Sequence, residues 1–111
     1  MLTKMIPEIN IDQLKEKLDN QEEIILIDVR FEQELQYGKI KYSIMIPLPE
    51  LPDKLNLIEE YKNKEIIVYC RSGGRSAKAT EYLIKSGFKD VKNLVGGILA
   101  WKKYDTSIKE Y

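Results

Sequence analysis

Two short runs of apolar residues, at 24–29 and 65–69, constrain the fold of this chain more than any other feature. Residues 24–29 read Ile-Ile-Leu-Ile-Asp-Val, and residues 65–69 read Glu-Ile-Ile-Val-Tyr. Continuous apolar runs of this length, rich in β-branched residues, predict strands that are buried on both faces. Strands of that kind are typical of a parallel sheet that helices cover on both sides.

Segments with helical spacing alternate with these runs along the chain. Asn10 and Gln13 have the spacing of a capping box at the start of the first segment. Helices are expected at residues 11–18, 31–36, 49–61, about 75–85, and after Gly96-Gly97. Further strands are expected at residues 9–11, 43–46 and 91–94. The alternation predicts an α/β fold with an open, mainly parallel five-stranded sheet flanked by helices.

Length and charge set the broad class of protein. The chain has 111 residues, which suits one domain, and we expect a single domain over residues 1–111. Basic and acidic residues number 18 each, so the net charge of zero argues against nucleic acid as a partner. No run approaches the ~20 apolar residues of a membrane helix, and the N-terminus lacks the apolar region of a secretory signal. We therefore expect a soluble and complete chain with no membrane partner.

The residue types that are missing exclude several kinds of site. Without any histidine, the chain cannot form a Ser-His-Asp triad, a Cys-His pair or a histidine metal site. With Cys70 as its one cysteine, it cannot form an intrachain disulfide or a thiolate zinc site. We therefore expect no metal and no cofactor. Because nothing in this set of residues requires an oxidising compartment, we expect the protein to be cytoplasmic.

Cys70 ends a predicted buried strand and opens a glycine-rich turn into a helix. Gly73 and Gly74 allow successive backbone N–H groups to point into one anion-binding concavity, and the start of the helix adds a positive dipole end. Arg71 and Arg75 add positive charge. They are two of only three arginines among the 18 basic residues of the chain. These features predict a lowered pKa for Cys70 and therefore a nucleophilic thiolate.

Three charged residues near residue 30 are candidates for support of this loop. Asp28 ends a predicted strand, as Cys70 does, and sites in parallel sheets lie at the carboxyl ends of the strands. Asp28 is compatible both with capping the next helix and with bracing the loop. For Arg30, a surface ion pair and a role in substrate binding both stay open. Glu34 is expected either to pair with an arginine or to face solvent.

The segment Cys70-Arg-Ser-Gly-Gly-Arg-Ser76 resembles the active-site loop of the rhodanese, or thiosulfate sulfurtransferase, family. Other segments resemble further motifs of that family in the same order. They are Asp28-Val29-Arg30, Glu34, Gly38-Lys39-Ile40, Ile44-Met45-Ile46-Pro47 and Gly96-Gly97-Ile-Leu-Ala-Trp101. The resemblance extends over most of the chain, and its length is similar to that of the small single-domain members.

The resemblance implies a specific chemistry. Cys70 would be the nucleophile that takes a sulfane sulfur from a small anion such as thiosulfate and becomes a persulfide. The persulfide would pass its outer sulfur to a thiophilic acceptor, which is cyanide in assays and otherwise an external thiol or a protein. Since the chain has no second cysteine, the acceptor has to be external.

The resemblance also implies a role for each residue of the loop. Arg71 would help to bind the oxyanion of the donor, and Arg75 would brace the loop through Asp28 or Glu34. The backbone amides that would hold the anionic sulfur belong to Arg71, Ser72, Gly73, Gly74, Arg75 and Ser76.

The chain departs from the family pattern at three places. Lys39 stands where the family usually has histidine, Tyr42-Ser43 replaces a Gly-Ala pair, and Glu32-Gln33-Glu34 replaces Pro-Glu-Glu. These departures concern packing near Gly38 and the access of substrate. None of them lies in the loop that begins at Cys70.

Two other classes of function use a similar fold. A phosphatase or an arsenate reductase also needs a cysteine thiolate, a cradle of amides and an arginine. The phosphatase pattern has five residues between cysteine and arginine, whereas Cys70 and Arg75 are separated by four, and Tyr69 stands where that pattern usually has histidine. A non-enzymatic sulfur-carrier or binding module is the third class. The sequence makes no prediction of the oligomeric state.

Overall fold

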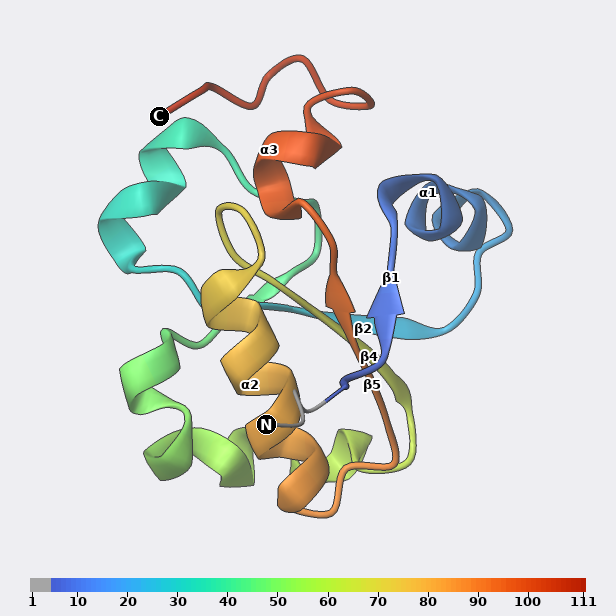
Figure 1. Cartoon of the computed structure of the whole chain (residues 1–111), viewed down its shortest axis with the longest axis vertical. Helices are drawn as coiled ribbons and strands as arrows, with labels where there is room; N and C mark the ends of the chain where they lie inside the picture. The colour runs from blue at the N-terminus through green and yellow to red at the C-terminus, as the bar shows by residue number, and fades with distance from the viewer. Residues whose placement is uncertain (1–4) are drawn as a thin grey trace.

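The computed structural model describes residues 5–111, and in them all strand pairs of the sheet are parallel (Figure 1). The strand order is β1-β5-β4-β2-β3. The strands are β1 (Glu8–Ile9), β2 (Ile24–Asp28), β3 (Ile44–Met45), β4 (Glu65–Tyr69) and β5 (Asp90–Leu94). The predicted open five-stranded α/β fold is therefore confirmed.

Helical segments connect the strands. The α-helices are α1 (Ile11–Asp19), α2 (Gly74–Lys85) and α3 (Gly97–Trp101), and the first 3-10 helix is η1 (Glu32–Tyr37). The predicted capping box is present at the start of α1, where Asn10 and Gln13 each accept a hydrogen bond from the other's backbone N–H. Within residues 5–111, no helix is both long and apolar enough to cross a membrane.

The prediction of one helix over residues 49–61 is wrong. The structure has three short 3-10 helices there, η2 (Leu48–Glu50), η3 (Pro52–Leu57) and η4 (Glu59–Tyr61). Proline has no N–H, so Pro52 cannot donate to the carbonyl of Leu48 the hydrogen bond that a continuous α-helix over these residues would have. Ile58, which is fully buried, also leaves helical geometry, with a φ of −119°. The apolar residues keep a helical spacing, but the backbone forms separate turns.

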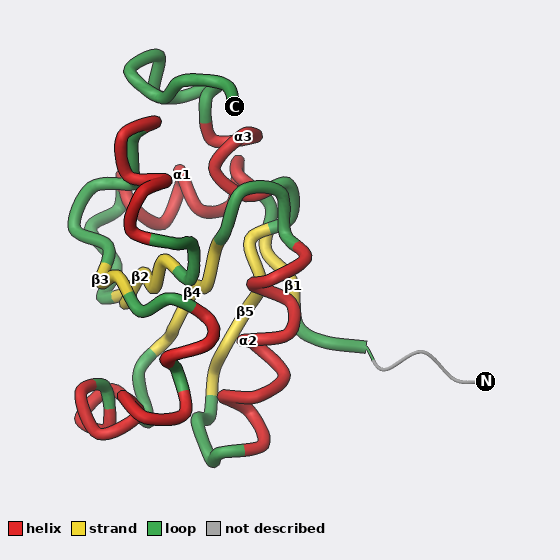
Figure 2. The backbone as a smooth tube through the Cα atoms, turned by 90° about the vertical axis from the view of Figure 1, so that its left-hand side faces the viewer, coloured by secondary structure: helices red, strands yellow, loops and turns green. Residues whose placement is uncertain are grey.

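The sheet separates two apolar layers, and Figure 2 shows its strands running through the middle of the molecule with helical segments around them. Alternate residues of β4 enter opposite layers because successive side chains of a strand point to opposite faces. Ile66 and Val68 lie in the layer that α2 and the 3-10 helices η2 to η4 complete, and Ile67 and Tyr69 lie in the layer completed by α1 and α3. Burial on both faces agrees with the apolar runs of the sequence.

The carboxyl ends of the two central strands bring the candidate site together. Asp28, at the end of β2, is paired in register with Tyr69, at the end of β4. The residues that follow these strands are therefore neighbours, although about forty positions separate them in the sequence. In Figure 1 the loop between β4 and α2 lies between η1 and α3.

Candidate active site

Cys70 directly follows β4, and its side chain faces the turn that leads into α2. The backbone N–H of Gly73 donates a hydrogen bond to the Sγ of Cys70 at 3.1 Å, and the hydroxyl of Ser76 lies 3.4 Å from the same sulfur. Gly73 has a φ of +119°, a conformation that side chains disfavour, so glycine permits this turn. The loop therefore folds its own donors around the sulfur.

The surroundings of Cys70 have opposing effects on its pKa. Burial raises the pKa, because the residue is only 1% exposed and a buried thiolate loses hydration. The hydroxyl of Ser76 and the backbone N–H groups of Ser76, Gly73 and Ser72 lower it more. The net result is a pKa below the ordinary value for cysteine, in the direction that the sequence predicts.

Ser76 is itself held by a buried asparagine on β5. Its hydroxyl donates a hydrogen bond to the Oδ1 of Asn93 at 2.5 Å. The Nδ2 of Asn93 donates to the carbonyl of Gly73 at 3.3 Å, which fixes the orientation of the amide. Asn93 was not predicted from the sequence. Its one signal is that it lies two residues after the apolar Val91 on β5, so the alternation of a strand places it on the same buried face.

The start of α3 packs against the loop and donates hydrogen bonds to its backbone. The backbone N–H of Ile98 donates to the carbonyl of Cys70 at 2.9 Å, and that of Leu99 donates to the carbonyl of Arg71 at 3.2 Å. A Cβ atom on Gly97 would lie 2.5 Å from the oxygen of Arg71 and 2.6 Å from that of Cys70. Glycine at position 97 therefore lets the helix approach the loop closely enough to donate these hydrogen bonds.

Arg75 is anchored by Glu34 on η1. Its two terminal nitrogens donate to the two carboxylate oxygens of Glu34 at 2.5 and 3.0 Å. Burial raises the pKa of Glu34, but hydrogen bonds from Arg75, from the hydroxyl of Tyr111 and from the N–H of Phe31 lower it to about 2. Of the two partners that the sequence left open for Arg75, the structure shows Glu34.

Asp28 pairs with Arg30 rather than with the loop. The Nε and Nη2 of Arg30 donate to the two carboxylate oxygens of Asp28 at 3.0 and 2.8 Å. Its Nη2 also donates to the carbonyl of Gly38 at 2.7 Å, and its Nη1 to that of Glu34 at 3.3 Å. Burial lowers the pKa of Arg30, but hydrogen bonds to Asp28 and Tyr111 raise it more. Because Arg30 is fully buried, the interpretation as a surface ion pair is wrong.

The other residues of the loop face outward. Ser72 and Gly74 are exposed, and a Cβ atom on Gly74 would meet no atom within 4 Å. The guanidinium of Arg71 lies 5.1 Å from the centre of the Tyr111 ring. Tyr111 was also not predicted from the sequence, because no local pattern marks it.

This arrangement suits a nucleophilic thiolate that binds anions. The sulfur is stabilised by hydrogen bonds at the start of a helix, and two arginines flank the turn. The model of the rhodanese-like domain matches residues 10–104. The chain belongs to the rhodanese-like family.

Individual relatives also support membership of the rhodanese-like family. A sulfurtransferase of Allochromatium vinosum is 35% identical over 94% of this chain and 95% of its own length. A putative sulfurtransferase of Bacillus subtilis is 41% identical over 87% of this chain and 91% of its own. The crystal structure of a rhodanese-like domain protein from Staphylococcus aureus is 38% identical, covers 86% of this chain and 91% of its own, and superposes with a TM-score of 0.79.

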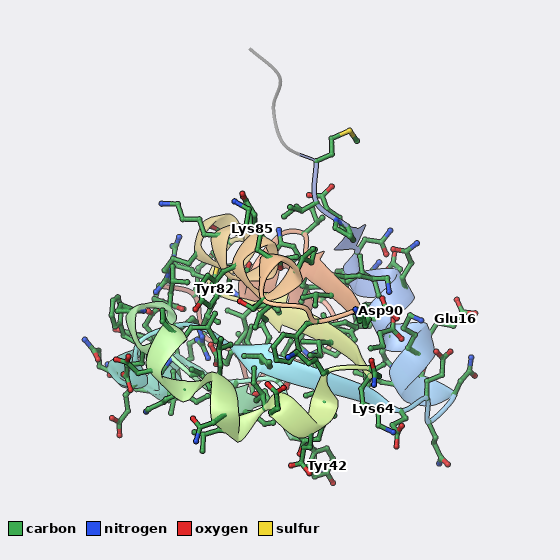
Figure 3. The ribbon with its side chains drawn as sticks, turned by 90° about the horizontal axis from the view of Figure 1, so that it is seen from below. Glu16, Tyr42, Lys64, Tyr82, Lys85 and Asp90 are labelled. Carbon is green, nitrogen blue, oxygen red and sulfur yellow. The ribbon has the colours of Figure 1, made fainter. Side chains whose placement is uncertain are left out.

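The departures from the rhodanese pattern lie outside the loop. Lys39 is exposed, and Tyr42 is 82% exposed and projects away from the protein in Figure 3. Tyr42 has a φ of +69°, so the backbone keeps a conformation that suits the glycine usual at this position. Gly38, whose surroundings these departures concern, packs against Ile108.

Proposed function

We propose that this protein is a sulfurtransferase that carries sulfane sulfur on Cys70 between thiosulfate, or a similar small anion, and an external acceptor. The observation that carries the proposal is the hydrogen bond from the N–H of Gly73 to the Sγ of Cys70, with the hydroxyl of Ser76 3.4 Å from the same sulfur. Hydrogen bonds to the charged form favour the thiolate, which is the reactive species.

In the first half-reaction the thiolate of Cys70 attacks the outer sulfur of thiosulfate. A bond forms between the Sγ and that sulfur, the sulfur–sulfur bond of thiosulfate breaks, and its electron pair leaves with sulfite. Arg71 would bind the oxyanion end of the donor through its planar, always charged guanidinium. The N–H groups of the turn would hold the outer sulfur of the persulfide.

In the second half-reaction an external nucleophile attacks the outer sulfur of the persulfide. Cyanide takes that sulfur as thiocyanate, and the electron pair of the broken bond returns to Cys70 as a thiolate. No other cysteine is present in the chain to resolve the persulfide, so the sulfur has to leave to an external acceptor. We infer that the acceptor in the cell is a thiol of a small molecule or of a protein.

The length of the loop favours sulfur transfer over phosphoryl transfer. Four residues separate Cys70 from Arg75, one fewer than in the phosphatase pattern, and the shorter turn suits a single sulfur atom better than a tetrahedral phosphoryl group.

The test is formation of thiocyanate from thiosulfate and cyanide, with hydrolysis of an aryl phosphate and reduction of arsenate as parallel assays. Thiocyanate formation that depends on Cys70 supports the proposal. Turnover of aryl phosphate or arsenate without thiocyanate would contradict it.

A further inference from the structure

The residues after α3 lie against the candidate active site. Ile108 is buried and packs on Gly38, and the N–H of Lys109 donates to the carbonyl of Tyr37 at 2.8 Å. In Figure 1 this part of the chain runs above α3 and ends above η1. Residues 105–111 lie beyond the part of the chain that the rhodanese-like model matches, so the family pattern does not include them.

The hydroxyl of Tyr111 joins the two ion pairs beside the loop. It donates a hydrogen bond to the Oε2 of Glu34 at 2.6 Å and accepts one from the Nη1 of Arg30 at 3.1 Å. Glu34 in turn holds Arg75, and Arg30 holds Asp28. One hydroxyl group therefore connects both charged pairs, and this fixes the position of the Tyr111 ring.

The ring of Tyr111 lies between an aromatic side chain and a cation. It stacks on Tyr37 with a centroid distance of 4.3 Å and an interplanar angle of 5°. The guanidinium carbon of Arg71 lies 5.1 Å from the ring centre. Because Tyr37 covers one face in parallel stacking, the guanidinium takes the other face, where the ring attracts a cation.

Arg71 differs from the other two arginines in what holds it. Arg30 and Arg75 each form a two-pronged ion pair with a carboxylate. Among residues 5–111, Arg71 has no carboxylate within salt-bridge distance, and its guanidinium contacts the ring of Tyr111. No carboxylate of the described residues therefore neutralises its charge, while its position is restricted by the ring.

We propose that Tyr111 is a positioning residue that holds Arg71 beside Cys70 and thereby sets the affinity of the site for the oxyanion of the sulfur donor. This inference rests on the proposed function, because it assigns the donor to Arg71. A cation on an aromatic face keeps its N–H groups free at the edge of the guanidinium plane, so Arg71 can bind an oxyanion without losing an ion pair.

The ring and the hydroxyl of Tyr111 have separate effects that two variants distinguish. Tyr111→Phe keeps the ring under Arg71 and removes the hydrogen bonds to Glu34 and Arg30. Tyr111→Leu removes the ring as well. We expect Tyr111→Leu to raise the KM for thiosulfate about two- to fivefold, with kcat changed less than about twofold, and Tyr111→Phe to keep most of the wild-type KM.

A double-mutant cycle separates positioning from a general structural role. In an Arg71→Ala background, Tyr111→Leu is expected to cause no further rise in the KM for thiosulfate, because the group that it positions is absent. An equal rise in both backgrounds, or a fall in kcat alone, would overturn the inference. If Tyr111→Leu does not fold, Tyr37→Leu removes the ring that supports Tyr111 and is measured in its place.

A second readout does not depend on turnover. Sulfate is an unreactive oxyanion, and its dissociation constant follows from the NMR shifts of the loop N–H groups. We expect sulfate to bind more weakly to Tyr111→Leu than to the wild type and to Tyr111→Phe. Equal affinity for all three, or no binding to the wild type, would overturn the inference. Weaker binding to Tyr111→Leu without any thiocyanate formation would support the inference about Arg71 and reject the proposed function.

Discussion

Glu34 and Arg75 form a two-pronged ion pair that ties η1 to the first turn of α2 across 41 positions of the sequence. The hydroxyl of Tyr111 donates to the same carboxylate. The pKa of Glu34 is consequently lowered from 4.5 to about 2. Since this pair lies beside the turn that contains Cys70, the stability of the candidate site depends on the charge of one carboxylate.

This ion pair predicts a specific pH dependence of stability. A carboxyl group with a lowered pKa in the folded protein stabilises it fully above about pH 4.5, and the stabilisation disappears as the pH falls towards 2. We expect Glu34→Gln to lose on the order of 2 kcal/mol at pH 7, allowing for the partial exposure of Arg75. The loss should vanish near pH 2.

Urea unfolding at a series of pH values measures this effect. Glu32→Gln is the matched control, because Glu32 lies exposed on the same 3-10 helix. An equal effect of both substitutions, or a Glu34→Gln effect that persists at low pH, would reject the role of the ion pair.

The close approach of α3 to the loop predicts different effects of two glycine substitutions. Gly97 has a φ of +58°, and a Cβ atom there would lie 2.5 Å from the backbone oxygen of Arg71. A Cβ atom on Gly74 would meet no atom within 4 Å. We expect Gly97→Ala to lower the free energy of unfolding by at least about 2 kcal/mol and Gly74→Ala to change it by less than about 1 kcal/mol. Urea denaturation of both variants checks this, and similar losses would contradict it.

The conformation of Tyr42 predicts a stabilising substitution. Its φ of +69° costs energy for any residue with a Cβ, and its side chain is largely exposed. We expect Tyr42→Gly to be more stable than Tyr42→Ala by about 1 kcal/mol, because only the alanine keeps the unfavourable Cβ. Thermal unfolding of the two variants makes the comparison, and a more stable alanine variant would show that this strain is absent.

The hydrogen bonds around Cys70 predict how its pKa responds to substitution. Ser76→Ala removes the hydroxyl that contacts the sulfur, so the pKa of Cys70 should rise. The single proton of this hydroxyl is shared between the sulfur and the nearer Oδ1 of Asn93, so the substitution should also cost about 1–3 kcal/mol of stability. The rate of alkylation against pH reports the pKa of the thiol.

Ser72→Ala is the control for this experiment. It removes an exposed hydroxyl but keeps the backbone N–H that contributes to the low pKa of Cys70. A pKa that rises equally in both variants, or in neither, would show that the hydroxyl of Ser76 does not stabilise the thiolate.

Local signals in the sequence were sufficient to predict much of the fold. The apolar runs predicted β2 and β4 because a strand buried on both faces has to be apolar at every position. The capping box at Asn10 predicted the start of α1. The prediction of one helix over residues 49–61 failed because helical spacing of apolar side chains does not distinguish one α-helix from successive 3-10 turns. Pro52, which lacks the N–H of a continuous helix, favours the separate turns.

The candidate site was predictable where its residues are contiguous. The turn after Cys70 carries its glycines and arginines in one segment, so the sequence alone indicates an anion-binding thiolate. Asn93 and Tyr111 were missed because their roles exist only after β5 and residues 105–111 have packed against that turn. The full burial of Arg30 was missed for the same reason, since charge alone does not indicate depth.

The central claim is that Cys70 carries sulfur, and intact mass after incubation with thiosulfate in the absence of reductant tests it most directly. We expect the wild-type chain to gain the mass of one sulfur atom on Cys70 and to lose it on addition of cyanide. Cys70→Ser should keep its fold by circular dichroism and gain no sulfur. Absence of the adduct while the thiol of Cys70 is free, or an equal adduct on Cys70→Ser, would contradict the account.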